Sequence, residues 1–218
     1  MLFFIKLFNN NRKINGILLL FTAYCLVLLV VRAKLTHSIY LFFLVWNLFL
    51  AFVPYFFISY LKSKISLQKN KIKALSLLFV WLLFLPNSFY LITDFIHLSQ
   101  SSNHLVWFDL VVFSSYALIG FTLGIISLIE FENIIKTYTS PLITNLIMPV
   151  ICFLSGIGIY LGRILRYNSW DIISDPLEIV RAIYLAVSSA HALLFSFYFG
   201  VYIYLFFFLK KIYSTINQ

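Results

Sequence analysis

The feature that most constrains this chain is a series of six apolar runs, each about as long as a membrane-spanning helix requires. A helix needs roughly 20 predominantly apolar residues to cross the hydrocarbon layer of a bilayer. We expect spans at residues 14–31, 39–61, 74–92, 106–129, 142–161 and 183–209. The sequence therefore predicts an all-α, polytopic membrane protein that forms one six-helix bundle with no second domain.

Composition agrees with this class and argues against a nucleic-acid-binding protein. Hydrophobic residues make up 62% of the chain and charged residues only 11%, against roughly 45–50% and 25% in soluble domains. The net charge of +9 comes from short clusters of Lys and Arg between apolar runs, so membrane lipids are the expected partners and nucleic acid is not. The sequence indicates no oligomeric state.

The distribution of basic residues predicts an orientation. Alternate connecting segments carry 11 Lys and Arg residues on one side of the membrane and 5 on the other. Cytoplasmic loops of membrane proteins carry the excess of Lys and Arg. We therefore expect both termini in the cytoplasm, which places five of the seven acidic residues on the outer side.

A polar stripe marks the end of the third span. Asn87, Tyr90, Asp94 and His97 follow one another at intervals of three, four and three, which places them on one side of an α-helix. Polar and ionisable groups at membrane depth usually face the bundle interior or a water-filled cavity. The stripe is therefore the first candidate functional site.

A second polar cluster follows the fifth span and includes Arg163, Arg166 and Asp171. The topology brings it to the same membrane face as the stripe and Asp109, so we expect one contiguous polar site. His191 is a further candidate member, because it falls in the outer half of the last span. The last helix is expected to begin near Pro176, after an N-cap at residue 175.

Two interpretations of this site need no substrate. Asp94 and His97 have the spacing of two metal ligands and Asp109 could supply a third, but the chain has no His-Glu-x-x-His or Cys-rich pattern, so no metal site is predicted. Alternatively, Arg163 or Arg166 neutralises one of the acids, and the cluster is an ion-pair network in a transporter subunit or a structural membrane component.

A third interpretation is recognition or modification of a lipid head group or a lipid-linked substrate. Guanidinium groups bind phosphate in a planar fork, which would suit Arg163 and Arg166. In an enzyme, Asp94 or His97 would act as general base, with Asp109 as a further catalytic candidate. The substrate-binding candidates are Asn87, Tyr90, Arg163, Arg166, Asp171 and His191. The sequence indicates no cofactor.

Glycines predict close helix packing in the fourth and fifth spans. Gly120 and Gly124, and Gly158 and Gly162, each form a pair of small residues four apart, which allows a neighbouring helix to approach. If the fifth helix continued without a break, Arg166 would lie on the same stripe as its glycine pair and point inward.

Three motifs occur in order from the third span onward. They are Leu85-Pro86-Asn87 with Tyr90, Thr93, Asp94, His97 and Leu98; Trp107 with Asp109; and Gly162-Arg163 with Arg166 and Asn168-Ser169-Trp170-Asp171. In these residues the chain resembles the bacterial integral-membrane proteins catalogued as domain of unknown function 1361. Phe89 and Phe108 depart from the pattern. The resemblance implies a multi-pass protein of the bacterial cytoplasmic membrane and no established activity.

Overall fold

The computed structural model describes residues 12–101 and 104–216, and their regular structure is helical. The elements are α2 (Arg12–Thr36), the 3-10 helix η1 (Tyr40–Phe42), α3 (Phe43–Ser63), α4 (Ile65–Lys69), α5 (Lys71–Tyr90), the 3-10 helix η2 (Leu91–Gln100), α6 (Val106–Ile135), α7 (Pro141–Arg163), α8 (Asp171–Ser174), α9 (Pro176–Ser188) and α10 (Ala190–Ile216). In this part of the chain, six helical segments are long and apolar enough to cross a membrane. The predicted all-α bundle of six spans is confirmed, and the protein is integral to the membrane.

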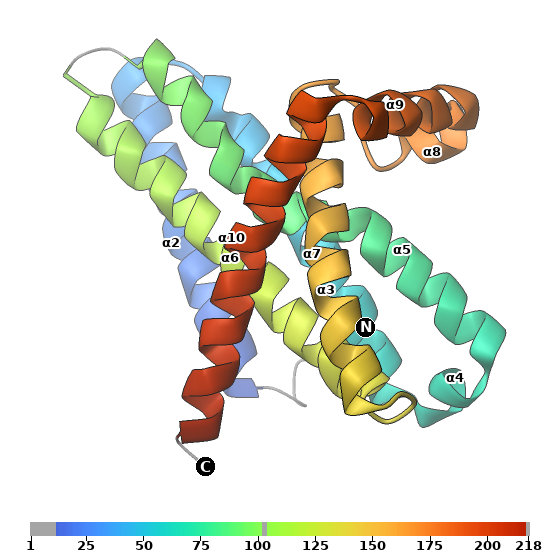
Figure 1. The fold of residues 1–218 in the computed structure, drawn as a ribbon. Helices are drawn as coiled ribbons and strands as arrows, with labels where there is room; N and C mark the ends of the chain where they lie inside the picture. Colours follow the sequence, from blue (N-terminus) through green and yellow to red (C-terminus); the bar gives the residue numbers. More distant parts are fainter. Residues whose placement is uncertain (1–11, 102–103, 217–218) are drawn as a thin grey trace.

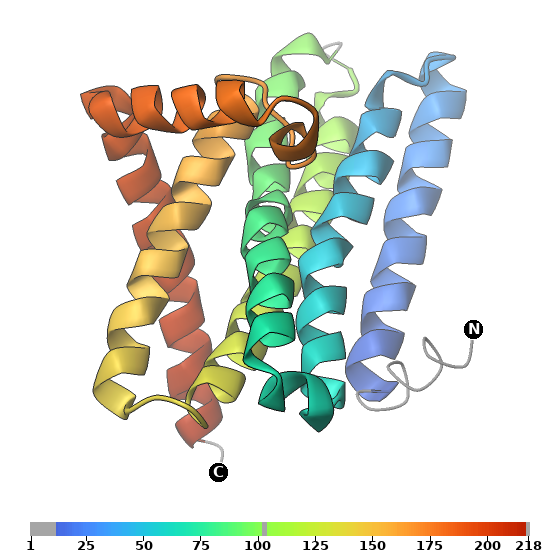
Figure 2. The ribbon, with the colours of Figure 1, turned by 90° about the vertical axis from the view of Figure 1, so that its right-hand side faces the viewer.

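The six long helices run between two ends of the bundle (Figures 1 and 2). We call one the α4 end, where α4 lies and where α2 begins and α10 terminates. The other is the η2 end, which contains η2, α8 and α9. Figure 2 shows α9 lying across this end, nearly at right angles to the spans.

The central helix of the bundle is α6, which is the most buried of the six spans. It packs against α2, α3, α5 and η2. A Cβ atom on Gly120 would lie 2.8 Å from the backbone carbonyl oxygen of Ser88 on α5, so a larger residue there would force the two helices apart. The first small-residue pair therefore makes the close contact that its spacing predicts.

The third span changes its helical form before it ends. The α-helix α5 stops at Tyr90, and the chain continues as the 3-10 helix η2 for ten residues, which is long for this conformation. Side chains three residues apart are eclipsed in a 3-10 helix. Asp94 and His97 therefore lie directly above one another, which differs from the α-helical stripe expected from the sequence.

The last helix is divided in two. The Asp175 side chain caps α9 by accepting a hydrogen bond from the N–H of Glu178 at 3.4 Å, as expected. Ser189 then adopts an extended conformation, and α10 begins at Ala190 rather than as part of a helix continuous from Pro176. The sixth span accordingly starts at residue 190, not at residue 183. The buried side of α9 faces the bundle, as in an interfacial helix.

Candidate functional site

Arg163, the last residue of α7, reaches the polar residues at the end of the third span. Its guanidinium forms an ion pair with Asp94, donates to Thr93 Oγ1 at 2.8 Å and lies over the Tyr90 ring at 4.2 Å from the centroid. The second oxygen of Asp94 accepts from Asn47 Nδ2 on α3 at 3.0 Å. The Asp94 side chain is only 1% exposed, so this pair lies within the protein. The contacts bind α3, η2 and α7 together.

His97 extends this network towards the surface. Its Nε2 lies 3.5 Å from Arg163 Nη1, and its Nδ1 lies 3.1 Å from the Tyr40 hydroxyl, which donates to Gln100 Oε1 at 2.6 Å. Arginine can only donate, so Nε2 accepts and Nδ1 carries the proton. Both ring nitrogens therefore have partners.

We call Asn47, Tyr90, Thr93, Asp94, His97 and Arg163 the Arg163 cluster. Both carboxylate oxygens of Asp94 and both ring nitrogens of His97 already have partners in it. His97 has no free lone pair, because Nδ1 carries the proton and Nε2 accepts from Arg163. Each oxygen of Asp94 accepts one hydrogen bond, and its contact with Arg163 holds the carboxylate in place.

Asp109 belongs to a different ion pair. Arg32 of α2 donates from Nε to Oδ1 at 3.1 Å and from Nη2 to Oδ2 at 3.2 Å. Ser101 donates to the same carboxylate at 2.5 Å, and Arg32 Nη1 donates to Thr36 Oγ1 at 3.3 Å. We call these four residues the Arg32 cluster. Arg32, which the sequence reasoning did not include in the site, therefore holds the carboxylate expected to join Asp94 and His97.

No metal site emerges from these residues. Within residues 12–101 and 104–216, no three His, Cys, Asp or Glu side chains gather closely enough to hold an ion. Asp94 and His97 are neighbours, but Asp109 lies in the Arg32 cluster. The structure therefore does not bring Asp94, His97 and Asp109 together as three metal ligands.

The remaining candidates lie apart from the Arg163 cluster. Arg166 follows α7 with a φ of 63°, in the left-handed region, so it is not on the helical stripe that was expected to point it inward. Its side chain is exposed, and the structure records no hydrogen bond or ion pair for it within the described residues. Asp171 accepts from the N–H of Asn168 at 2.7 Å and closes a turn. His191 is exposed on α10 and has an edge contact with Tyr160.

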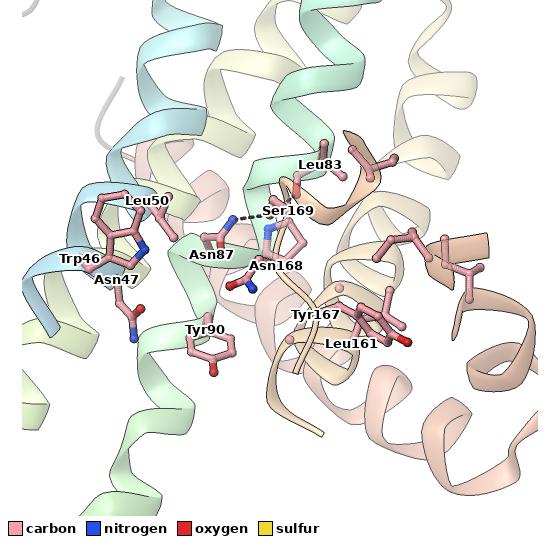
Figure 3. A pocket seen from close by; sticks show the side chains of 16 residues that line it. Trp46, Asn47, Leu50, Leu83, Asn87, Tyr90, Leu161, Tyr167, Asn168 and Ser169 are labelled. Atoms are coloured by element: carbon pink, nitrogen blue, oxygen red, sulfur yellow. Dashed lines mark hydrogen bonds between the residues drawn. The ribbon is translucent and has the colours of Figure 1, made fainter. Parts of the chain in front are cut away.

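A cavity of about 170 Å³ lies beside the Arg163 cluster, between α3, α5, α7 and the segment that leads into α9. Figure 3 shows Asn47, Asn87, Tyr90 and Asn168 around it. It is lined by Trp46, Asn47, Leu50, Leu83, Pro86, Asn87, Tyr90, Gly158, Leu161, Gly162, Tyr167, Asn168, Ser169, Ile172, Ile179 and Ile183. The walls are mostly apolar, with a few amide and hydroxyl groups among them, which is the usual make-up of a small-molecule site.

Local contacts fix the shape of this cavity. Asn87 Nδ2 donates to Ser169 Oγ at 2.9 Å, which ties the segment after α7 to α5. A Cβ atom on Gly158 would collide with the ring of Pro86, so α7 can approach α5 this closely only with glycine there. At the rim, the rings of Trp46 and Trp170 meet edge to face at 6.0 Å between centroids.

The cavity and the Arg163 cluster share two residues. Asn47 lines the cavity and also donates to Asp94, while Tyr90 lines the cavity and also lies under the Arg163 guanidinium. A molecule in the cavity would therefore touch the residues that hold the ion pair in place. Of the site residues predicted from the sequence, the structure brings together Asn87, Tyr90, Asp94, His97 and Arg163 around this cavity and its adjoining cluster.

Comparison with known proteins identifies the family. The family described as "Protein of unknown function (DUF1361)" matches residues 46–206, a range that contains the whole Arg163 cluster and every cavity residue. No curated protein and no solved structure matches the chain. Because the match covers most of the sequence, the chain belongs to the DUF1361 family, as its motifs predict.

Proposed function

We propose that this protein binds a lipid, or a lipid-linked molecule, through a phosphate-bearing head group at its η2 end. The observation that carries the proposal is the mostly apolar cavity with its amide groups, which is lined in part by Tyr167, the chain neighbour of Arg166. The structure records no partner for the Arg166 guanidinium within the described residues. Arginine in such a position presents a planar fork of donors that matches phosphate.

The composition of the cavity suits a molecule with polar and apolar parts. Its apolar walls would hold carbon chains or rings, and Asn87, Asn168 and Ser169 would orient polar groups. Trp46 and Trp170 at the rim are typical of the interface between hydrocarbon and water, where a lipid head group lies. In this proposal Asp94, His97 and Asp109 have a positioning role, because each is held by hydrogen bonds to residues of other helices.

The side of the membrane is part of the proposal. The α4 end carries most of the basic residues, which favours a cytoplasmic α4 end and an η2 end at the outer face of a bacterial cytoplasmic membrane. Reporter fusions after Asn70 and after Ser101 test this orientation. A cytoplasmic signal at Ser101 would reverse it.

Native mass spectrometry of the protein extracted with its own lipids tests the binding. We expect a phosphate-containing species on the wild-type protein and its loss from Arg166→Ala. Arg181→Ala is the matched control, because Arg181 lies at the same end but is exposed and paired with Glu178. Its bound species should not change.

A second variant tests the cavity separately from the charge. Ile183→Trp would place a large ring at the cavity wall from α9 and should also remove the bound species. The proposed lipid recognition is wrong if Arg166→Ala and Ile183→Trp both fold and keep the same bound species. It is also wrong if the wild-type protein carries no bound species. The alternative, an ion-pair network in a transporter subunit or structural component, would then remain.

A further inference from the structure

A second groove lies at the α4 end, away from the Arg163 cluster. It has a volume of about 540 Å³ and lies between the start of α5 and the end of α6. It is lined by Leu61, Gln68, Lys69, Lys71, Ala74, Leu75, Leu78, Phe131, Ile134, Ile135 and Tyr138. Its inner wall is made of buried apolar side chains, while Leu75 is 65% exposed. The groove thus runs along the lipid-facing side of two spans.

The mouth of this groove is positively charged. Residues 62–73 contain five lysines and no acidic residue. Of these lysines, Lys69 and Lys71 line the groove. Both lysines are exposed beside the apolar wall, so their charges are accessible to an anionic head group.

The acidic residues at this end are engaged elsewhere. Glu130 pairs with Lys62 at 2.6 Å, and Glu132 pairs with Lys136 at 3.1 Å and with Lys211 at 2.8 Å. In the part of the chain that the structure describes, neither Lys69 nor Lys71 has a recorded ion pair. Their charges are therefore available to a ligand.

Hydrogen bonds hold the mouth in shape. Gln68 Nε2 donates to the carbonyls of Leu61 and Lys62 at 3.0 and 3.2 Å, which fixes α4 to the end of α3. From the opposite side, the Tyr138 hydroxyl donates to Gln68 Oε1 at 3.4 Å. Asn70 caps α5 by accepting from the N–H of Lys73 at 3.2 Å. The positive end of the α5 dipole thus adds to the two lysines.

We propose that this groove binds an anionic glycerophospholipid, with one acyl chain along the apolar wall and its phosphate between Lys69 and Lys71. An acyl chain is the natural occupant, because the walls belong to membrane-spanning segments. A zwitterionic lipid would leave the lysines less well neutralised. Basic sites between spans are known places for anionic head groups. The groove lies at the opposite end from the cavity beside the Arg163 cluster, and the proposal does not depend on the function proposed there.

Trp81 provides a probe inside the protein. It is 1% exposed and stacks on Phe131, a groove residue, with 4.5 Å between ring centroids. A chain with Trp81 as its single tryptophan is made by Trp46→Phe, Trp107→Phe and Trp170→Phe. This variant is placed in two kinds of bilayer. One contains brominated phosphatidylglycerol, and the other contains brominated phosphatidylcholine at the same fraction. Bromine quenches tryptophan fluorescence only at short range, so we expect stronger quenching by phosphatidylglycerol.

Charge variants then locate the site. Each lysine near a phosphate contributes about 1 kcal/mol, which corresponds to roughly a fivefold change in affinity. Lys69→Gln and Lys71→Gln should each lower the preference for phosphatidylglycerol by that factor, and together should nearly abolish it. Lys73→Gln is the matched control, because Lys73 is exposed in the same segment but does not line the groove. The preference of Lys73→Gln for phosphatidylglycerol should equal that of the parent chain.

Three results would overturn the proposal. Equal quenching by the two lipids in the parent chain would mean that the groove does not select anionic lipid. An equal loss of preference in Lys73→Gln and Lys71→Gln would mean diffuse attraction to the whole basic segment. Ala74→Leu, which narrows the groove without changing charge, should reduce quenching by both lipids. Unchanged quenching in this variant would place the bound chain elsewhere.

Discussion

Two buried arginine–aspartate pairs at the η2 end use the same chemistry in different ways. Arg32 directs two nitrogens at the two oxygens of Asp109, whose side chain is 1% exposed. Ser101 donates a third hydrogen bond to Asp109, and Thr36 accepts one from Arg32 Nη1. This pair is a closed clamp that joins α2 to α6.

Arg163 distributes its nitrogens over three residues. One goes to Asp94, one to Thr93 and one to the ring of His97. The Arg163–Asp94 pair lies beside the 170 Å³ cavity, whereas no residue of the Arg32 cluster lines that cavity. A bidentate pair is lost as a unit, while a distributed arginine can exchange one partner and keep the others. The comparison therefore assigns stability mainly to the Arg32 cluster and adaptability to the Arg163 cluster.

The largest effect should come from breaking the clamp. Arg32→Met leaves the Asp109 carboxylate buried without its cation, and removal of one partner of a buried pair costs about 3–5 kcal/mol. We expect a large loss of thermal stability in detergent. Thermal unfolding measures this loss, and size-exclusion chromatography checks that the variant is folded. The double variant Arg32→Met with Asp109→Leu should recover most of the loss, since no charge remains. A single variant as stable as the wild type would show that the clamp is not structural.

The sequence predicted the fold because run length alone identifies spans. It also predicted the cap of α9, since Asp175, Pro176 and Glu178 follow local rules. The Arg163–Asp94 pair was among the pairings expected. These successes depend on short-range patterns or on the fact that the two residues share a membrane face.

The partners of Arg32 could not be predicted in this way. Arg32 was assigned to the segment after the first span, and nothing in its neighbourhood indicates that α2 packs against α6. The 3-10 form of η2 was missed because residues 91–100 contain neither Gly nor Pro. The division between α9 and α10 falls at Ser189, which carries no strong helix-breaking signal. In each case the outcome depends on which helices meet, a property of the whole bundle.

A smaller effect is expected when the distributed arginine is changed conservatively. Arg163→Lys keeps a positive charge near Asp94, but an ammonium group cannot also reach Thr93 and His97 or stack flat on Tyr90. We expect a loss of about 1.5–3 kcal/mol, the usual value of a hydrogen bond to a charged group, in the same thermal unfolding measurement. The same change at the other pair, Arg32→Lys, is the comparison. If Arg163→Lys cost more than Arg32→Lys, the assignment of the clamp would have to be reversed.

The smallest effect on stability, and the sharpest test of function, concerns Arg166. A non-glycine residue in the left-handed region costs about 1 kcal/mol, and glycine adopts that conformation readily. Arg166→Gly should therefore leave thermal stability unchanged or raise it by up to about 1 kcal/mol, while it removes the guanidinium that we assign to phosphate. Arg166→Ala removes the same group but keeps the backbone strain, so it should lose the bound lipid without any gain in stability. A glycine variant that retained the lipid would remove Arg166 from the site. If Arg166→Gly lost as much stability as Arg163→Lys, Arg166 would support the Arg163 cluster. Arg166 and the cluster would then act as one network.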